Sequence, residues 1–93
     1  MEIKKERNGE KLIFYIEENN KRVAEIVNRM PGADRIIIEH TEVSDVLRGK
    51  GIGKKLVDHV VAYARENELR IVPMCSFARS VFKRFPKEYE DVL

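Results

Sequence analysis

The stretch that decides the fold is Val43-Ser44-Asp45-Val46-Leu47-Arg48-Gly49-Lys50-Gly51-Ile52-Gly53-Lys54-Lys55-Leu56-Val57. It leads from a β-branched segment through a glycine-rich loop into a segment with helical periodicity. Unpaired N–H groups at a helix start can surround a phosphate, and glycines let it approach the backbone. Lys54 and Lys55 oppose the helix dipole, which makes better sense if an anion binds there. On the loop alone, a glycine-rich surface turn with solvated lysines is an equally good interpretation.

Two common phosphate motifs fit this loop less well. The Walker A loop needs a longer glycine spacing followed by Lys-Ser or Lys-Thr, whereas Lys54 is followed by Lys55. A Rossmann fingerprint needs a glycine three residues after Gly51, where this chain has Lys54. The pattern that remains is Arg/Gln-x-x-Gly-x-Gly/Ala, which Arg48, Gly51 and Gly53 satisfy.

The segments before the loop have the patterns of strands. Alternating apolar residues predict two strands over 10–17 and 22–29, which form a hairpin through a turn at Asn19-Asn20. The continuous β-branched run over 35–43 predicts a central strand that is covered on both faces.

The segments after the loop predict a βαβ crossover and a second helix. Apolar residues at helical spacing predict a helix from Ile52 to about Asn67, and the short apolar run over 69–73 predicts a strand beside the central one. Ser76 is expected to cap a helix that ends before Pro86. The predicted order is ββ(β)αβα, an α+β fold in the form of an α/β sandwich.

Composition limits the class of protein. The 93 residues are expected to form a single domain, 1–93, and a composition of 43% hydrophobic and 37% charged residues is typical of a globular protein. The net charge of only +2 gives no reason to expect nucleic acid as a partner. The charged N-terminus and the lack of a long apolar run predict a cytoplasmic protein without membrane segments, and we expect a monomer. With Cys75 as the only cysteine, no intrachain disulfide or cysteine-based zinc site is possible, and no metal is expected.

The loop and its context resemble the pyrophosphate-binding motif of the GNAT superfamily of N-acetyltransferases. More narrowly, the chain is similar to the very short YjdJ-type GNAT-like proteins, through His40-Thr41-Glu42-Val43, Ala64-Arg65-Glu66-Asn67 and Pro73-Met74-Cys75-Ser76-Phe77-Ala78. The resemblance implies acetyl-CoA as co-substrate, with its pantetheine arm between the strands that end near Val43 and Pro73. It also implies that the Val43 N–H polarises the thioester carbonyl. The cofactor-binding residues are then Val43, Arg48, Gly49, Lys50, Gly51, Ile52, Gly53 and Lys54.

The sequence departs from the family pattern on the side of the acceptor. Many GNAT enzymes have additional N-terminal helices that shape the acceptor pocket, whereas this chain begins almost directly with its hairpin. The tyrosine that many members use to protonate the leaving thiolate has no clear counterpart, because Tyr63 lies in the first predicted helix and Tyr89 near the C-terminus. The leading prediction is acetyl transfer to an unidentified amine, small or on a protein. The alternatives are a non-catalytic acyl-CoA-binding or sensing module and, with less support, a domain that binds a partner through its sheet edge.

Three side chains are candidates for the chemistry. Cys75 precedes a predicted helix whose dipole favours a thiolate, so it can accept acetyl or act as an acid toward the sulfur of CoA. The alternative is a small buried hydrophobe. His40 and Glu42 are two residues apart on a strand, so they share a face and either can take a proton from an amine. The alternative for these two is a role in the sheet or in ion pairs. His59 is expected to be solvated, and Phe14, Phe77, Phe82 and Phe85 are expected in the core.

Overall fold

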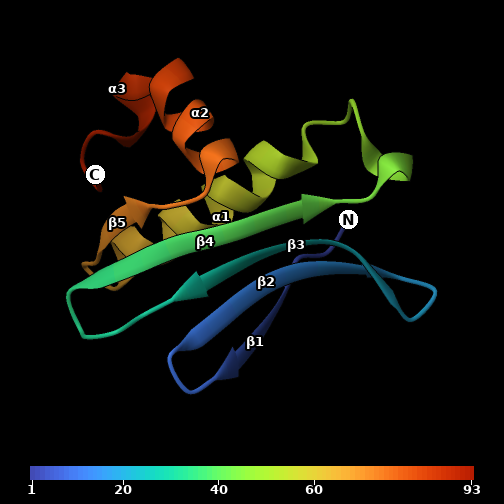
Figure 1. Ribbon diagram of the computed structural model, residues 1–93, viewed down its shortest axis with the longest axis horizontal. Helices are drawn as coiled ribbons and strands as arrows, with labels where there is room; N and C mark the ends of the chain where they lie inside the picture. The colour runs from blue at the N-terminus through green and yellow to red at the C-terminus, as the bar shows by residue number, and fades with distance from the viewer.

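The computed structural model describes residues 1–93 as a mixed five-stranded sheet with three helices and a short 3-10 turn (Figure 1). The sheet order is β1-β2-β3-β4-β5, in which only the β4–β5 pair is parallel. This is an α+β fold, as the sequence predicts. None of the helices is long and apolar enough to cross a membrane. The elements are β1 (Lys4–Asn8), β2 (Lys11–Glu18), β3 (Lys21–Arg29), β4 (Arg35–Val43), η1 (Asp45–Leu47), α1 (Ile52–Glu66), β5 (Arg70–Pro73), α2 (Ser76–Arg84) and α3 (Pro86–Tyr89).

The core lies between one face of the sheet and α1. Alternate residues of a strand share a face, and the α1 face of the sheet is the apolar one. Burial of each such aliphatic side chain stabilises the fold by about 1.5–3 kcal/mol. The buried side chains that meet here are Leu12, Phe14, Ile16, Ala24, Ile26, Ile36 and Ile38 from the strands, and Ile52, Leu56, Val57, Val60, Val61 and Ala64 from α1.

The β2–β3 hairpin and the βαβ crossover agree with the sequence prediction. The β2–β3 hairpin turns at Asn19 and Asn20, whose φ angles are +53° and +64°, a backbone conformation that asparagine tolerates better than most residues. The predicted βαβ crossover is also confirmed, because β4 and β5 pair in parallel and α1 connects them.

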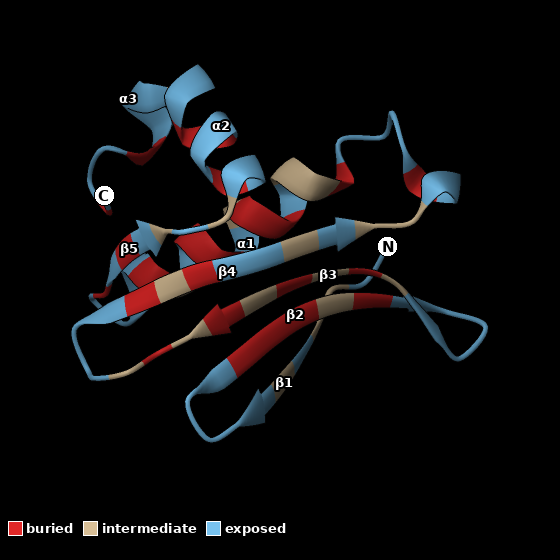
Figure 2. Ribbon diagram, viewed as in Figure 1, coloured by how far each residue is buried: buried red, intermediate tan, exposed pale blue.

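Four sequence expectations about the fold are wrong in part. β1 was not predicted, because it is an edge strand whose residues, Lys-Lys-Glu-Arg-Asn, lack apolar alternation. α3 was not predicted either, since it begins at Pro86, where proline ends α2 but also suits the first position of a new helix. The residue before α2 is Cys75, so Ser76 is the first helical residue rather than the cap. β4 is covered on one face only, because Ile37 is half-buried and Glu39 and His40 are exposed (Figure 2).

A β-bulge in β4 separates this strand from β5. Val27 pairs with His40 and Asn28 with Ile38, so Glu39 is an extra residue in β4. β5 pairs with β4 only as far as Ile38. The carbonyl of Ile38 then accepts the N–H groups of both Met74 and Cys75, at 3.0 and 3.1 Å, and the chain turns away into α2. The backbones of β4 and of the segment that leads into α2 therefore diverge after Ile38, and we call the region between residues 39–43 and the start of α2 the wedge.

Candidate functional site

The glycine loop presents a run of unused backbone donors. Gly49 and Gly51 have φ angles of +78° and +69°, in the left-handed region that glycine adopts readily, and Gly51 is the N-cap of α1. The first helical hydrogen bond runs from Lys55 N–H to the Gly51 carbonyl, at 3.1 Å. None of the backbone N–H groups from Gly49 to Lys54 donates a hydrogen bond within the protein. Such donors at the positive end of a helix form an anion-binding site.

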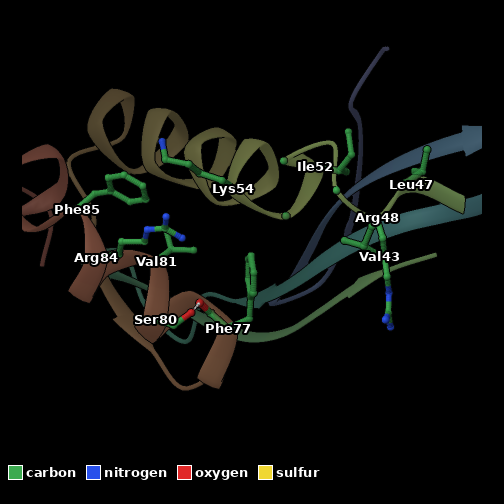
Figure 3. A pocket seen from close by; sticks show the side chains of 13 residues that line it. Val43, Leu47, Arg48, Ile52, Lys54, Phe77, Ser80, Val81, Arg84 and Phe85 are labelled. Carbon is green, nitrogen blue, oxygen red and sulfur yellow. Dashed lines mark hydrogen bonds between the residues drawn. The ribbon is translucent and has the colours of Figure 1, made fainter. Parts of the chain in front are cut away.

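A groove with a volume of about 560 Å³ lies beside this loop, between α1 and α2 (Figure 3). Val43, Gly49, Gly51, Ile52 and Gly53 line one side, and residues of α2 line the other. The charged residues that line it are Arg48, Lys54 and Arg84, with no Asp or Glu among the lining residues. A groove whose only charged lining residues are cations favours an anionic ligand.

The three cations of the groove differ in their partners. Arg48 Nε lies 2.9 Å from Asp45 Oδ1, and its side chain turns away from the start of α1 (Figure 3). Lys54 Nζ lies 3.1 Å from Asp58 Oδ2 and 3.2 Å from Glu88 Oε1. The hydroxyl of Tyr89 and these two carboxylates raise the pKa of Lys54. Arg84 makes no ion pair with a carboxylate and lies against the ring of Phe85.

The first turns of α1 and α2 meet through Phe77 and Gly53. A Cβ atom on Gly53 would lie 2.4 Å from Cζ of Phe77, so only glycine fits under this ring in its present position. Phe77 is 40% exposed and lines the groove, so the expectation that it lies in the core is wrong. The ring spans the space between the two helix starts.

The backbone of β4 supplies one further donor at the wedge. The N–H of Ser44 bonds to the Val23 carbonyl of β3, at 2.7 Å. Successive residues of a strand direct their N–H groups to opposite edges of that strand. The N–H of Val43 therefore points to the edge of β4 that faces away from β3, where β5 no longer pairs. Val43 also lines the groove, so this donor lies at the boundary between the groove and the wedge.

Cys75 lies on the opposite side of the wedge. Its Sγ is 3.5 Å from Oγ1 of Thr41, which is two residues before Val43, or roughly 7 Å along the strand. Burial raises the pKa of the Cys75 thiol, but the backbone N–H groups of Ala78 and Phe77 and the hydroxyl of Thr41 outweigh this and lower the pKa below its ordinary value. Because Cys75 is only partly buried, the expectation of a wholly buried hydrophobe does not describe it.

The other residues singled out from the sequence lie outside the groove. His40 and Glu42 of β4 pair with Val27 and Glu25 of β3, which lie on the face of the sheet away from α1, so both side chains point away from α1. His40 Nε2 is 3.4 Å from Glu42 Oε2. Both are exposed. Lys50 belongs to the loop but does not line the groove. His59 is exposed as expected, although its ring packs edge-on against Phe14 at 4.7 Å.

Sequence reasoning missed the contribution of α2 to the groove. Phe77, Ser80, Val81 and Arg84 all line it. Their spacing of i, i+3, i+4 and i+7 places them on one face of a helix, which is a signal that the sequence contains. Nothing in the sequence alone indicates that this face turns toward the glycine loop.

The fold is that of acetyltransferases of known structure. A candidate GCN5-like N-acetyltransferase from Staphylococcus aureus, solved by NMR, matches with a TM-score of 0.70 and 42% identity over 96% of this chain and 85% of that one. A GNAT family acetyltransferase from Elizabethkingia anophelis with acetyl-CoA bound matches with a TM-score of 0.63 and 16% identity, over 85% of this chain and 53% of that one. A predicted acetyltransferase from Clostridium acetobutylicum with acetyl-CoA matches with a TM-score of 0.66 and 21% identity, over 82% of this chain and 56% of that one. The chain thus spans little more than half the length of the last two.

The sequence also identifies the family. The profile of the family described as GCN5-related N-acetyl-transferase matches residues 13–92. The chain therefore belongs to the GCN5-related N-acetyltransferases, the GNAT superfamily. No curated protein matches the sequence.

Proposed function

We propose that this protein transfers the acetyl group of acetyl-CoA to an amine, either small or on a protein. The observation that carries the proposal is the run of unused N–H groups from Gly49 to Lys54, which borders a groove lined by cations and no carboxylate. A pyrophosphate supplies the negative charge and the acceptor oxygens that such donors require. Family membership supports the same ligand, and two structures with this fold contain acetyl-CoA.

The wedge gives the acetyl end of the cofactor a place to react. With the pyrophosphate on the loop, the pantetheine arm runs between β4 and the start of α2, where β5 no longer pairs with β4. The N–H of Val43 then polarises the thioester carbonyl and stabilises the oxyanion that forms on it. One such donor typically changes a rate by about 10²–10³-fold.

Two routes lead from this arrangement to an acetylated amine. In direct transfer, the neutral amine attacks the thioester carbon, the new C–N bond replaces the C–S bond, and the CoA thiolate leaves and takes up a proton. His40 or Glu42 accepts the proton that the amine loses. Because both residues lie on the face away from α1, the amine approaches from that open face.

In the second route, Cys75 carries the acetyl group. Its thiolate attacks the thioester carbon and releases the CoA thiolate. The amine then attacks the carbonyl carbon of the acetylated cysteine, and the new C–N bond replaces the C–S bond. This step regenerates the Cys75 thiolate, and the CoA thiolate takes up the proton that the amine loses. The lowered pKa of Cys75 favours the first step. Cys75 lies across the wedge from Thr41, close to the position proposed for the thioester.

A non-catalytic acyl-CoA-binding or sensing role is the second candidate function. It is favoured by the exposure of His40 and Glu42, whose side chains are 57% and 74% accessible. Glu42 borders only a small cavity of about 220 Å³, which His40 does not line. In this role, the protein binds acetyl-CoA without consuming it.

Thermal unfolding with acetyl-CoA tests the shared part of these proposals. At about one hundred times Kd, binding stabilises the fold by roughly 2.7 kcal/mol, which raises Tm by roughly 4–8 °C for each kcal/mol. An unchanged Tm at millimolar acetyl-CoA would contradict both candidate functions. Release of CoA over time in the presence of a mixture of amines then separates transfer from binding alone.

Two variants separate the routes of transfer. Cys75→Ala abolishes the second route and leaves the first intact, whereas His40→Gln combined with Glu42→Gln removes the proposed bases of the first. Intact mass after incubation with acetyl-CoA alone shows whether Cys75 becomes acetylated. If neither variant lowers the rate, the named residues do not perform the chemistry.

A further inference from the structure

We propose that Arg84 binds the 3′-phosphate of CoA and makes the site selective for 3′-phosphorylated CoA over its dephosphorylated form. This inference rests on the proposed function, since it assigns a second phosphate site to the same ligand. CoA carries a pyrophosphate and, on the adjoining ribose, a separate 3′-phosphate. In the proposed function the unused N–H groups of the loop bind the pyrophosphate, so the 3′-phosphate needs another partner.

The position of Arg84 in the groove supports this role. It occupies the last turn of α2, on the same face as Phe77, Ser80 and Val81, and all four line the groove. Figure 3 shows its guanidinium projecting from α2 into the space between the two helices, beside Phe85. Arg84 therefore lies at the opposite end of the α2 face from Phe77, which contacts the first turn of α1.

Charge pairing distinguishes Arg84 from the other cations of the groove. Arg48 is paired with Asp45, and Lys54 is held between Asp58 and Glu88. Arg84 has no carboxylate partner and no hydrogen bond within the protein. Its planar guanidinium can bind two phosphate oxygens at once, and no internal ion pair must be broken first.

The side chains of Lys54 and Arg84 approach the same aromatic ring. Lys54 Nζ and Arg84 Cζ lie 4.9 Å and 5.5 Å from the centroid of the same Phe85 ring. Lys54 is in the first turn of α1, where the pyrophosphate is proposed to bind. Arg84 is thus one aromatic ring away from the amino group of Lys54, and it lines the same groove as the loop glycines. The ribose that carries the 3′-phosphate is bonded directly to the pyrophosphate.

The test compares two ligands and three forms of the full chain. Dissociation constants for CoA and 3′-dephospho-CoA are measured by calorimetry for the wild type, for Arg84→Gln and for Lys83→Gln. Lys83 is the matched control, because it is an exposed cation on the same turn of α2 that does not line the groove. We expect the wild type to bind CoA about 10-fold more tightly than dephospho-CoA, as one charge-assisted contact supplies.

The expected pattern in the variants is specific to one phosphate. Arg84→Gln should bind CoA about 10-fold more weakly while its affinity for dephospho-CoA stays unchanged, and Lys83→Gln should match the wild type for both ligands. Equal binding of both ligands by the wild type would overturn the inference and leave the proposed function standing. An equal loss for both ligands in Arg84→Gln would place this residue on the pyrophosphate and also overturn it. Failure of the wild type to bind either ligand would overturn the proposed function as well.

Discussion

The two halves of the sheet differ in how far their strands pair and in whether their backbone donors have partners. In the β1–β3 half, charges pair across neighbouring strands: Lys4 Nζ lies 3.2 Å from Glu17 Oε1, and Arg22 is bonded to Glu6. These strands form antiparallel ladders along their length, with one register shift between Ile16 and Glu17. In the half that contains β4, the glycine loop and α2, the strand pairing stops, a run of N–H groups has no partner, and Arg84 has no counter-ion.

This difference separates what the chain needs in order to fold from what it keeps for a ligand. Polar groups satisfied within the protein contribute to stability, and their removal is felt by the fold. Donors that remain unpaired at a helix start contribute nothing to the fold until an anion arrives. Substitutions in the first half should therefore alter stability without altering CoA affinity, whereas those in the second half should do the reverse.

The largest effect is expected at Gly51, and Gly9 provides its control. Both residues have positive φ, +69° and +62°, and an added Cβ would meet no atom within 4 Å at either. Gly51→Val and Gly9→Val should therefore lose similar stability, about 1–2 kcal/mol, from the strained backbone. Only Gly51→Val should weaken CoA binding, by about 100-fold, because its side chain covers donors of the loop. CoA titration of the two folded variants measures this, and equal affinities would place the phosphate elsewhere.

The second effect concerns Cys75, whose lowered pKa makes it reactive at a lower pH than an ordinary thiol. The rate of alkylation should reach its midpoint at a lower pH than the rate for an unperturbed cysteine does. Thr41→Val should move that midpoint upward, because it removes a hydroxyl that stabilises the thiolate. Acetyl-CoA should slow alkylation at every pH.

Cys75→Ala completes this test. It should leave the affinity for CoA nearly unchanged, since the phosphate donors lie on the loop. Slow alkylation that acetyl-CoA does not alter, together with a loss of stability in Cys75→Ala, would make this thiol a packing residue.

The same contrast explains which features could be read from the sequence. The hairpin, β4, α1 and the crossover have regular apolar periods, and the loop has a recognisable glycine pattern, so local rules were sufficient for them. β1 and α3 lack an apolar period, and tertiary contacts define them: β1 through its pairing with β2, and α3 through Tyr89, whose ring packs on Phe82.

The geometry of the site depends on contacts that no local pattern specifies. The bulge at Glu39 ends the pairing with β5 and sets which groups of β4 face the wedge, so His40 and Glu42 face away from α1 while Cys75 approaches Thr41. Likewise, the groove is formed when α2 packs beside α1, which places Arg84 and the loop along the same groove. Spacing along the chain identifies each helix face but not its neighbour.

A smaller effect is expected at Tyr89, which fastens α3 to α1. Its ring is 1% exposed and its hydroxyl donates to Asp58. Tyr89→Phe should lower the free energy of unfolding by about 1 kcal/mol, the net contribution of one hydrogen bond. Chemical denaturation of the wild type and the variant measures this. Because Asp58 also holds Lys54, a several-fold loss of CoA affinity would show that this cluster reaches the phosphate site.

Tyr89 also makes stability depend on pH. Burial and the hydrogen bond to Asp58 raise the pKa of Tyr89 above its ordinary value of 10.0. The folded state therefore holds this proton more tightly than the unfolded state, so its contribution is present below pH 10 and is lost as pH rises through the raised pKa. Tyr89→Phe should show a shallower loss of stability above pH 10 than the wild type. If the free energy of unfolding fell equally steeply with pH in both proteins, Lys54, whose pKa is also raised, would account for the pH dependence.

The smallest effect is expected at Arg22, in the half of the sheet whose charges are paired. Arg22 bonds to Glu6, lies 3.6 Å from Glu25 and stacks on the ring of Tyr15, with Cζ at 3.9 Å from the centroid. These groups are partly exposed, so Arg22→Gln should cost about 1 kcal/mol or less, and a double-mutant cycle with Glu6→Gln should assign only part of that to the ion pair. CoA affinity should stay at the wild-type value. Arg84→Gln should have the opposite effect: its affinity for CoA should fall while its free energy of unfolding changes little. If Arg22→Gln weakened CoA binding as much as Arg84→Gln does, the division between a folding half and a binding half of this sheet would be wrong.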